Sequence, residues 1–171
     1  MEPSAISLTE LLAARDNRAA RQRELLAAWP ERTLLSLTVV LPGAVKRDER
    51  SLRVGEAGVA AVRETLQPLY EEIRDLGTGF EAFFIVAADR LAAKRRACRI
   101  EDTHPWGRLM DIDVLEAGGD ETVHPISRTA VGLPERRCLL CGRPARECMR
   151  ARTHTYGELL RRIDEILQSG R

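Results

Sequence analysis

The sequence contains very little lysine and few aromatic residues. Lys46 and Lys94 are the only lysines among 27 basic residues, and aromatic residues make up 4% of the chain. The net charge is only +1, because 26 acidic residues nearly balance the basic ones. A nucleic-acid-binding domain usually has an excess of positive charge, or aromatic side chains that stack on bases. We therefore expect no nucleic-acid partner.

Long apolar runs and a secretory leader are also lacking. No run approaches the roughly 20 residues that cross a bilayer. Residues 1–4 do not begin a basic segment followed by an apolar one, as a secretory signal would. We therefore expect a cytoplasmic protein with no membrane partner. In that compartment the four cysteines are expected to be thiols or metal ligands rather than disulfides.

Apolar periodicity and turn residues predict one α+β domain over residues 1–171. Helices are expected at residues 8–28, 50–74, 89–101 and 156–168. Strands are expected at residues 33–41, 80–88, 108–116 and 122–127. Turns are expected at residues 77–79 and 118–120, and Pro125 predicts that the last strand lies at an edge. We expect a mixed or antiparallel sheet with flanking helices and a Cys/His-rich C-terminal segment at residues 136–154.

Two aspartates, Asp111 and Asp113, are separated by one residue within an apolar run. In a β-strand they point to the same face, while Ile112 and Val114 point into the core. Two adjacent carboxylates repel each other unless a cation lies between them. Mg²⁺ binds oxygen ligands and keeps coordination sites free for phosphate oxygens. The pattern therefore predicts a magnesium-dependent phosphoryl- or nucleotidyl-transfer site, with a purely structural aspartate pair as the alternative.

Residues near the aspartates add further candidates. Gly107 and Arg108 supply an unencumbered backbone and a cation, and His104 is a candidate acid, base or phosphate ligand. A third carboxylate ligand is left open among four residues: Glu81, Asp89, Glu101 and Glu116. The run also resembles the Asp-apolar-Asp element of the DNA polymerase β-like nucleotidyltransferases. It lacks the Gly-Ser or Gly-Gly pair that those proteins carry upstream.

Basic residues in the first part of the chain are candidate phosphate ligands. Arg15, Arg18 and Arg21 are three residues apart and share one face of the predicted helix. This face is either solvated or binds phosphate. Lys46 follows a strand and the Pro42-Gly43 turn, where a lysine is either exposed or in contact with phosphate.

The C-terminal part contains the spacing Cys-x2-Cys-x6-Cys-x5-His, formed by Cys138, Cys141, Cys148 and His154. Cys-x2-Cys-Gly is typical of a zinc knuckle, because the glycine lets backbone amides turn toward the thiolates. Three thiolates and one imidazole would complete a tetrahedral structural zinc site. The alternative is a set of reduced cysteines, with His154 capping the last helix.

Taken together, several segments resemble the apo-citrate lyase phosphoribosyl-dephospho-CoA transferases, also called citrate lyase holo-acyl-carrier-protein synthases. The similar segments occur in family order at residues 11–22, 36–43, 104–114, 136–141 and 153–154. The most specific are the run from His104 to Val114 and the Arg-Arg-Cys-Leu-Leu-Cys run at residues 136–141. Lys46 stands at the family's lysine position.

The resemblance implies a nucleotidyltransferase that matures citrate lyase by attaching its prosthetic group. The donor is 2′-(5″-triphosphoribosyl)-3′-dephospho-CoA, the acceptor is a serine of the acyl-carrier (gamma) subunit, and pyrophosphate leaves. Asp111 and Asp113 would hold Mg²⁺, and either an aspartate or His104 would take the serine proton. The residues expected to bind the donor are Lys46, Arg15, Arg18, Gly107 and Arg108.

Two other functions remain open at the level of the sequence. One is the same transfer onto the carrier subunit of malonate decarboxylase. The other is a non-enzymatic zinc-containing adaptor, in which Asp111 and Asp113 are structural.

Overall fold

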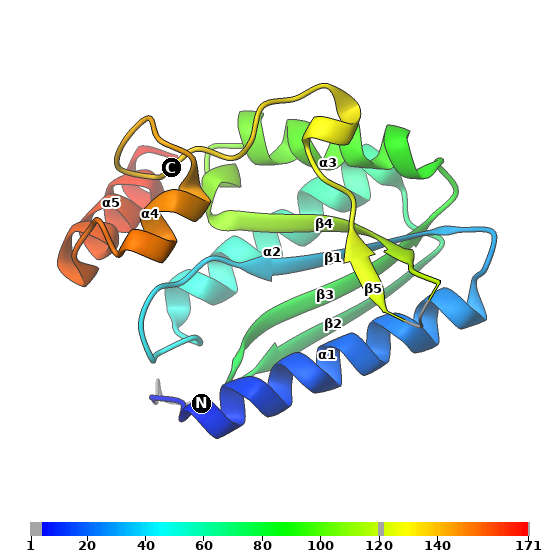
Figure 1. Cartoon of the computed structure of the whole chain (residues 1–171), viewed down its shortest axis with the longest axis horizontal. Coiled ribbons are helices and arrows are strands. Elements are labelled where there is room, and N and C mark those ends of the chain that lie inside the picture. Colours follow the sequence, from blue (N-terminus) through cyan, green and yellow to red (C-terminus); the bar gives the residue numbers. More distant parts are fainter. Residues whose placement is uncertain (1–4, 120–121, 171) are drawn as a thin grey trace.

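The computed structural model describes residues 5–119 and 122–170, and its centre is a five-stranded antiparallel sheet (Figure 1). The strand order is β2-β3-β1-β4-β5. The strands are β1 (Thr33–Val39), β2 (Tyr70–Leu76), β3 (Gly79–Val86), β4 (Met110–Ala117) and β5 (Val123–Pro125). The helices are α1 (Leu8–Ala28), α2 (Glu49–Leu66), α3 (Arg90–Thr103), α4 (Ala145–Ala151) and α5 (Tyr156–Ser169). Short 3-10 helices are η1 (Gly107–Leu109) and η2 (Thr129–Val131).

Four of these helices begin at a polar residue whose side chain accepts a hydrogen bond from a free backbone amide. The capping residues are Ser7 for α1, Asp48 for α2, Asp89 for α3 and Thr155 for α5. Such caps satisfy amides that have no partner within the helix. Local sequence therefore sets where these helices start.

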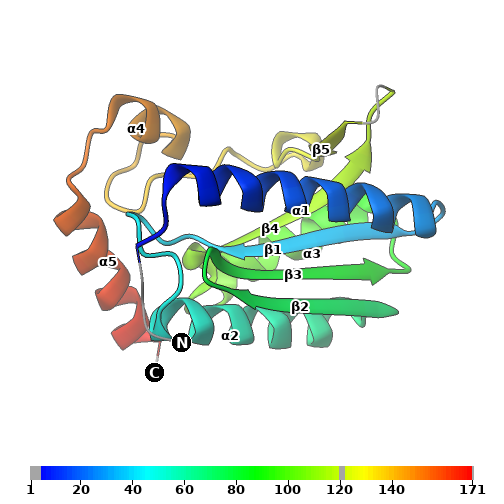
Figure 2. The same ribbon diagram turned by 90° about the horizontal axis from the view of Figure 1, so that it is seen from below.

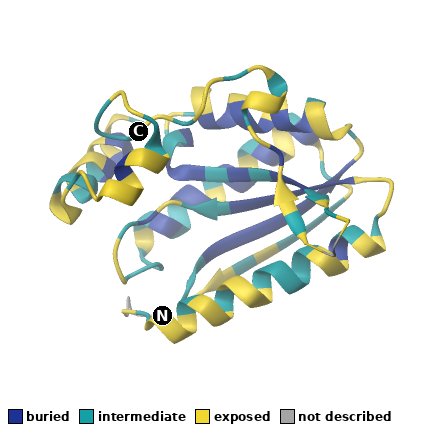
Figure 3. Cartoon of the chain, in the orientation of Figure 1, coloured by how far each residue is buried: buried dark blue, intermediate teal, exposed yellow. Residues whose placement is uncertain are grey.

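The two faces of the sheet pack against different helices. On one face, buried strand residues such as Leu35, Phe84 and Ile112 form a core with Val62 of α2 and Ala97 of α3. On the other face a smaller core surrounds Leu25 of α1 and contains Leu34, Phe83, Ile85 and Leu115. Buried positions are concentrated in the central strands, while the helices expose their outer sides (Figure 3).

Helices α4 and α5 lie together at one end of the sheet (Figure 2). Ile163, Ile166 and Leu167 of α5 are buried and join the larger core. None of the helices in the part of the chain that the structure describes is long and apolar enough to cross a membrane.

The predicted helix over residues 50–74 is wrong in its last third. Helix α2 ends at Leu66, Gln67 adopts a left-handed conformation with φ 48°, and Pro68 follows. Residues 70–76 instead form strand β2, which pairs antiparallel with β3. Apolar spacing alone does not distinguish these outcomes, because the partner strand supplies the hydrogen bonds that decide between them.

Most other predicted elements are confirmed. The α+β class, the antiparallel sheet, helix α1 and the edge position of β5 agree with the prediction. Strand β4 begins at Met110 rather than residue 108, because residues 107–109 form η1. Helix α4 is not predicted from the sequence. Asp120 of the predicted hairpin turn lies outside the described residues.

Gly107 allows the chain to turn tightly against the end of α3. A Cβ atom at this position would lie 2.4 Å from the Ile100 carbonyl oxygen and 2.5 Å from that of Glu101. Both are backbone atoms, which cannot move aside as a flexible side chain would. Gly107 therefore has a packing role that sets how η1, and hence β4, is joined to α3.

We expect Gly107→Ala to lower the free energy of unfolding by about 1–3 kcal/mol, because the methyl group overpacks this junction. Thermal melting would detect a fall of roughly 2–4 °C per kcal/mol. Gly157→Ala is the control, since a Cβ atom there meets nothing within 4 Å. Equal melting temperatures for the two variants would contradict the packing role.

Candidate active site

Asp111 and Asp113 lie on the same face of β4. Strand β4 pairs with β1 so that Asp111 is opposite Thr38 and Asp113 is opposite Ser36. Ile112 is fully buried on the other face. The predicted orientation of the two aspartates is thus confirmed, and their carboxylates share one polar area of the sheet.

The outer edge of β4 is covered by side chains near these aspartates. Strand β5 pairs with Leu115–Ala117, and within the described residues the beginning of β4 has no strand partner on that side. The Ile112 amide donates to Glu101 Oε1 at 2.8 Å. Arg136 Nη2 donates to the Met110 carbonyl oxygen at 2.6 Å. These side chains satisfy backbone groups that an additional strand would otherwise bind.

A cavity of about 300 Å³ opens beside this edge, and we call it the carboxylate cavity. Its charged lining residues are Lys94, Glu101, Asp111, Asp113, Arg128, Glu135, Arg136 and Arg146. Because α3 contributes Lys94 and Glu101 while β4 contributes both aspartates, the cavity brings together residues that are distant in sequence.

Glu101 is the one residue among the four candidate third carboxylates that lines the carboxylate cavity. Its Oε2 atom accepts from Arg128 Nη1 at 2.9 Å, and Arg136 Nη1 lies 3.6 Å from its Oε1 atom. Burial raises the pKa of Glu101, and the positive charge of Arg136 opposes that rise. With both oxygens held by protein groups, Glu101 positions β4 rather than facing the cavity as a free carboxylate.

Asp113 has an unusual protonation equilibrium. Its pKa is raised to about 6, first because the carboxylate is desolvated and second because Asp111 is negatively charged. Lys94 Nζ lies 3.9 Å from Asp113 Oδ1 and opposes the rise. Asp111 Oδ1 accepts from Arg136 Nη1 at 3.1 Å. The pair thus has cations nearby that do not fully offset its negative charge, which is the condition that favours a bound cation.

The predicted phosphate ligands from the first part of the chain do not line the carboxylate cavity. Lys46 Nζ donates to the Leu41 carbonyl oxygen at 2.6 Å, and burial, then the charge of Arg15, lowers the Lys46 pKa. Arg18 Nη1 lies 3.4 Å from Glu81 Oε1. Glu81 is opposite Thr38, and Thr38 is opposite Asp111, so Arg18 lies over the same sheet face as the aspartates.

Arg108 and His104 are also directed elsewhere. Arg108 lines a neighbouring cavity, and its Nη2 atom donates to the Arg137 carbonyl oxygen at 2.5 Å. His104 Nδ1 accepts from the Trp106 amide at 3.0 Å. His104 lines a further cavity, formed by α2 and α3. The structure therefore does not bring His104 to the carboxylates.

Sequence reasoning missed Lys94, Arg128 and Arg136 as residues of this cavity. Arg136 stands in the Arg-Arg-Cys-Leu-Leu-Cys run, so the sequence contained a signal that could have identified it as a site residue. Lys94 and Arg128 carry no local signal, because they reach the cavity only through the packing of α3 and of the chain after β5.

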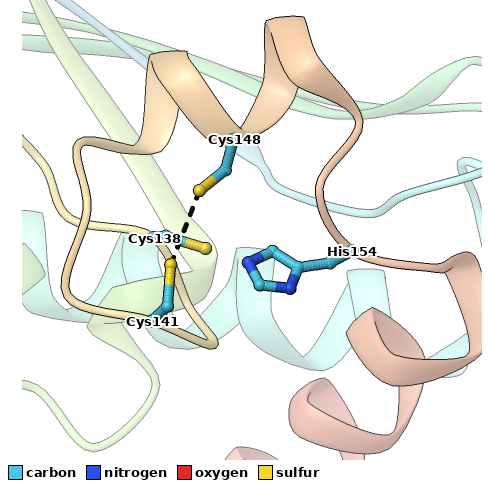
Figure 4. A group of neighbouring side chains, drawn as sticks. All are labelled: Cys138, Cys141, Cys148 and His154. Atoms are coloured by element: carbon cyan, nitrogen blue, oxygen red, sulfur yellow. Dashed lines mark hydrogen bonds between the residues drawn. The ribbon is translucent and has the colours of Figure 1, made fainter.

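Cys138, Cys141, Cys148 and His154 form a second cluster near the C-terminus (Figure 4). One ligand atom from each lies within 4.8 Å of all the others. A small hairpin carries the first two cysteines, since the Cys138 amide donates to the Arg143 carbonyl oxygen at 2.8 Å. The Leu140 amide donates to Cys138 Sγ at 3.5 Å. The spatial cluster predicted from the spacing is confirmed, and it could hold a metal ion.

One thiol of this cluster ionises readily, as metal binding requires. The Arg143 backbone amide, followed by the His154 ring, lowers the pKa of the Cys141 thiol to about 6. Burial raises the pKa of Cys148, whose Sγ atom is 3.5 Å from that of Cys141. His154 Nε2 is buried and has no hydrogen-bond partner among the described residues. A metal ion would give that nitrogen a partner.

Adjacent carboxylates in a cavity that also contains arginine and lysine define a candidate transferase of phosphate-containing groups. A family model described as apo-citrate lyase phosphoribosyl-dephospho-CoA transferase matches residues 6–170. The chain belongs to this family.

Named relatives agree with that membership. The apo-citrate lyase phosphoribosyl-dephospho-CoA transferase of Citrobacter koseri is 39% identical over 171 residues, covering 95% of this chain and 89% of that protein. A probable enzyme of the same name from Streptococcus pyogenes is 36% identical over 168 residues, covering 96% of this chain and 87% of that protein. This membership favours an enzyme over the non-enzymatic adaptor.

We expect Asp113→Asn to stabilise the protein at neutral pH. The folded carboxyl has a pKa of about 6, above its ordinary 3.8, so stability falls as pH rises between these values. At pH above about 6 the charged Asp113 therefore opposes folding. Because 40% of the side chain is exposed, solvent reduces the effect to about 1 kcal/mol, or roughly 2–4 °C.

Melting temperatures measured in magnesium-free buffer would check this expectation. The gain should be present at pH 7.5 and nearly absent near pH 3, below both pKa values, where Asp113 is mostly protonated in both states. Asp16→Asn, at an exposed position of α1, controls for the loss of one negative charge. A gain of the same size at both pH values would contradict the assignment.

Proposed function

We propose that this chain transfers phosphoribosyl-dephospho-CoA from triphosphoribosyl-dephospho-CoA to a serine of the citrate lyase carrier (gamma) subunit. Pyrophosphate would be released. Family membership supports the transfer to apo-citrate lyase. The observation that carries the site assignment is the Asp111-Asp113 pair on one face of β4, beside cations in the carboxylate cavity.

We assign Mg²⁺ to Asp111 and Asp113. Their hard oxygen ligands and incompletely compensated negative charge fit this ion. When bound, Mg²⁺ would neutralise the triphosphate and assist the departure of pyrophosphate. The chemistry is of the nucleotidyltransferase type, as the Asp-apolar-Asp strand suggests.

The protein's own groups have separate roles in this proposal. Arg136 orients Asp111 and offers positive charge to phosphate oxygens, and Lys94 does the same beside Asp113. Of the candidates for the serine proton, His104 lies outside the cavity, whereas Asp113 lines it. Asp111 accepts a hydrogen bond from Arg136, whereas the cation nearest to Asp113, Lys94, lies 3.9 Å away and leaves that carboxylate less engaged. We therefore propose Asp113 as the proton acceptor.

Cations on α1 and in the loop after β1 are proposed to contact the donor on the sheet face that carries the two aspartates. Arg15 is close enough to Lys46 for its charge to lower the Lys46 pKa, so positive charge gathers there. Arg18 lies over the same face as Asp111. These residues are proposed to bind phosphate groups of the donor.

We assign structural zinc to Cys138, Cys141, Cys148 and His154. Three thiolates and one imidazole form a typical tetrahedral zinc set. When bound, zinc would join the hairpin at residues 136–144 to α4 and to the start of α5. Arg136 lies in that hairpin, so the zinc site would hold this arginine at the edge of β4.

Intact-mass analysis of the apo carrier subunit, incubated with this protein, Mg²⁺ and triphosphoribosyl-dephospho-CoA, tests the function. We expect the carrier to gain the mass of one phosphoribosyl-dephospho-CoA group. Asp111→Asn should slow that gain at least about 100-fold, because the transition-state charge loses its stabilisation.

Asp75→Asn is the matched control, since Asp75 is also paired with an arginine but lies on the opposite edge strand, β2. Its rate should stay close to that of the unaltered protein. A normal rate with Asp111→Asn would move the metal site elsewhere. A mass gain on the malonate decarboxylase carrier, and none on the citrate lyase carrier, would overturn the assignment of the citrate lyase carrier as the acceptor.

The zinc assignment predicts one zinc per chain by elemental analysis. Cys141→Ser should lose the metal and lower the melting temperature by roughly 5–10 °C, since binding of a structural metal contributes directly to folding. Cys98→Ala, which alters a buried cysteine outside the cluster, should retain the metal. Full zinc occupancy in the Cys141→Ser protein would refute the ligand set.

A further inference from the structure

A second cavity, of about 700 Å³, adjoins the carboxylate cavity, and we call it the arginine cavity. The two cavities share Arg128, Glu135 and Arg136 in their linings. Five arginines line the arginine cavity: Arg108, Arg128, Arg136, Arg137 and Arg162. They come from η1, the segment after β5, the hairpin at residues 136–144 (the knuckle hairpin) and α5, so only the folded chain brings them together.

The arginine cavity has an excess of positive charge. Its lining contains two carboxylates, Asp102 and Glu135, against five guanidinium groups. Asp102 is already paired with Arg128, at 2.5 Å. Among the residues that the structure describes, neither Arg108 nor Arg137 forms an ion pair. Two guanidinium groups in one cavity therefore lack a carboxylate partner.

The surroundings of Arg108 disfavour the positive charge of its guanidinium group. Burial and then the neighbouring charge of Arg136 lower the Arg108 pKa. Its Nη2 atom donates to the Arg137 carbonyl oxygen, a neutral partner. The Arg137 side chain lies against the knuckle hairpin, with Nη1 3.8 Å from where a Cβ atom of Gly142 would be. Arg108 is thus positioned by a backbone contact with its charge left over, while Arg137 is exposed at the lining of the cavity.

Beside these cations the cavity has an apolar wall, formed by Pro105, Leu139, Leu140 and Ile166. A cavity of this size holds a small ligand, and fixed apolar and charged parts together orient it. Arginine forks bind phosphate oxygens through paired hydrogen bonds. The combination suits a diphosphate attached to an organic group.

We infer that the arginine cavity binds a diphosphate group of the donor substrate. This inference rests on the proposed function for the identity of the donor. That donor carries phosphate groups at two places, the terminal pyrophosphate of the triphosphate and the diphosphate of dephospho-CoA. Because the two cavities share a wall, one molecule would occupy both, with its reacting phosphate at Asp111 and Asp113.

Calorimetric titration of the full chain with inorganic pyrophosphate and, separately, with dephospho-CoA tests the inference. Arg137→Ala and Arg108→Ala should each weaken binding of at least one probe by about 10-fold or more, as expected for hydrogen bonds to charged groups. The exposed Arg161 neighbours Arg162 on α5 but does not line the cavity, so Arg161→Ala is the control. Melting temperatures would confirm that each variant folds.

The two probes distinguish the sources of the diphosphate. Arginine-dependent binding of dephospho-CoA assigns the cavity to the CoA end, and the variants should then raise KM for the donor with kcat nearly unchanged. Arginine-dependent binding of pyrophosphate assigns it to the leaving group, and kcat should fall. Affinities within 2-fold of the unaltered protein for both probes would overturn the inference.

Failure of the inference and failure of the proposed function would be distinguishable. If the carrier gains mass while neither probe depends on Arg108 or Arg137, the transfer stands and the arginine cavity has another role. If the probes depend on these arginines but no carrier is modified, the diphosphate site stands and the proposed transfer fails.

Discussion

The guanidinium group of Arg136 links strand β4, helix α3 and the hairpin at residues 136–144. It donates to the Met110 carbonyl oxygen at the free edge of β4, pairs with Asp111 and lies near Glu101 of α3. Through its position in the knuckle hairpin it also ties the Cys/His cluster to the sheet. A planar cation with several donors is suited to this task, because it binds carbonyl and carboxylate oxygens at the same time.

This arrangement lets two carboxylates stay close together on a folded sheet. Arg136 offsets the charge of Asp111, and the buried Lys94 opposes that of Asp113. The pKa of Asp113 is nevertheless raised, first by burial and second by the negative charge of Asp111. Charge repulsion between two carboxylates at the proposed magnesium site lowers stability in favour of the proposed function, which is a common compromise in enzymes. The neighbouring arginine cavity shows the opposite imbalance, an excess of positive charge.

Sequence patterns predicted the helices and strands well where local signals were strong. They failed where pairing with another strand decided the secondary structure. Helix α1 matches its predicted range, and the alternation around Ile112 places both aspartates correctly. The range 50–74 was predicted as a single helix, yet residues 70–76 form β2 because β3 offers an unpaired edge. Around the site, Glu101 could not be chosen from four candidates, and His104 was expected near the aspartates but lies at another cavity.

By itself the sequence determined the features that depend on short spacing. These are the shared face of Asp111 and Asp113, the Cys-x2-Cys spacing with its two further candidate ligands, and the resemblance to the family to which the chain belongs. Only the tertiary structure decided that Glu101 holds the edge of β4 and that Arg108 lines a second cavity. The physical reason is range: strand alternation and ligand spacing are set by neighbouring residues, whereas these contacts require α3, β4 and the C-terminal segment to pack together first.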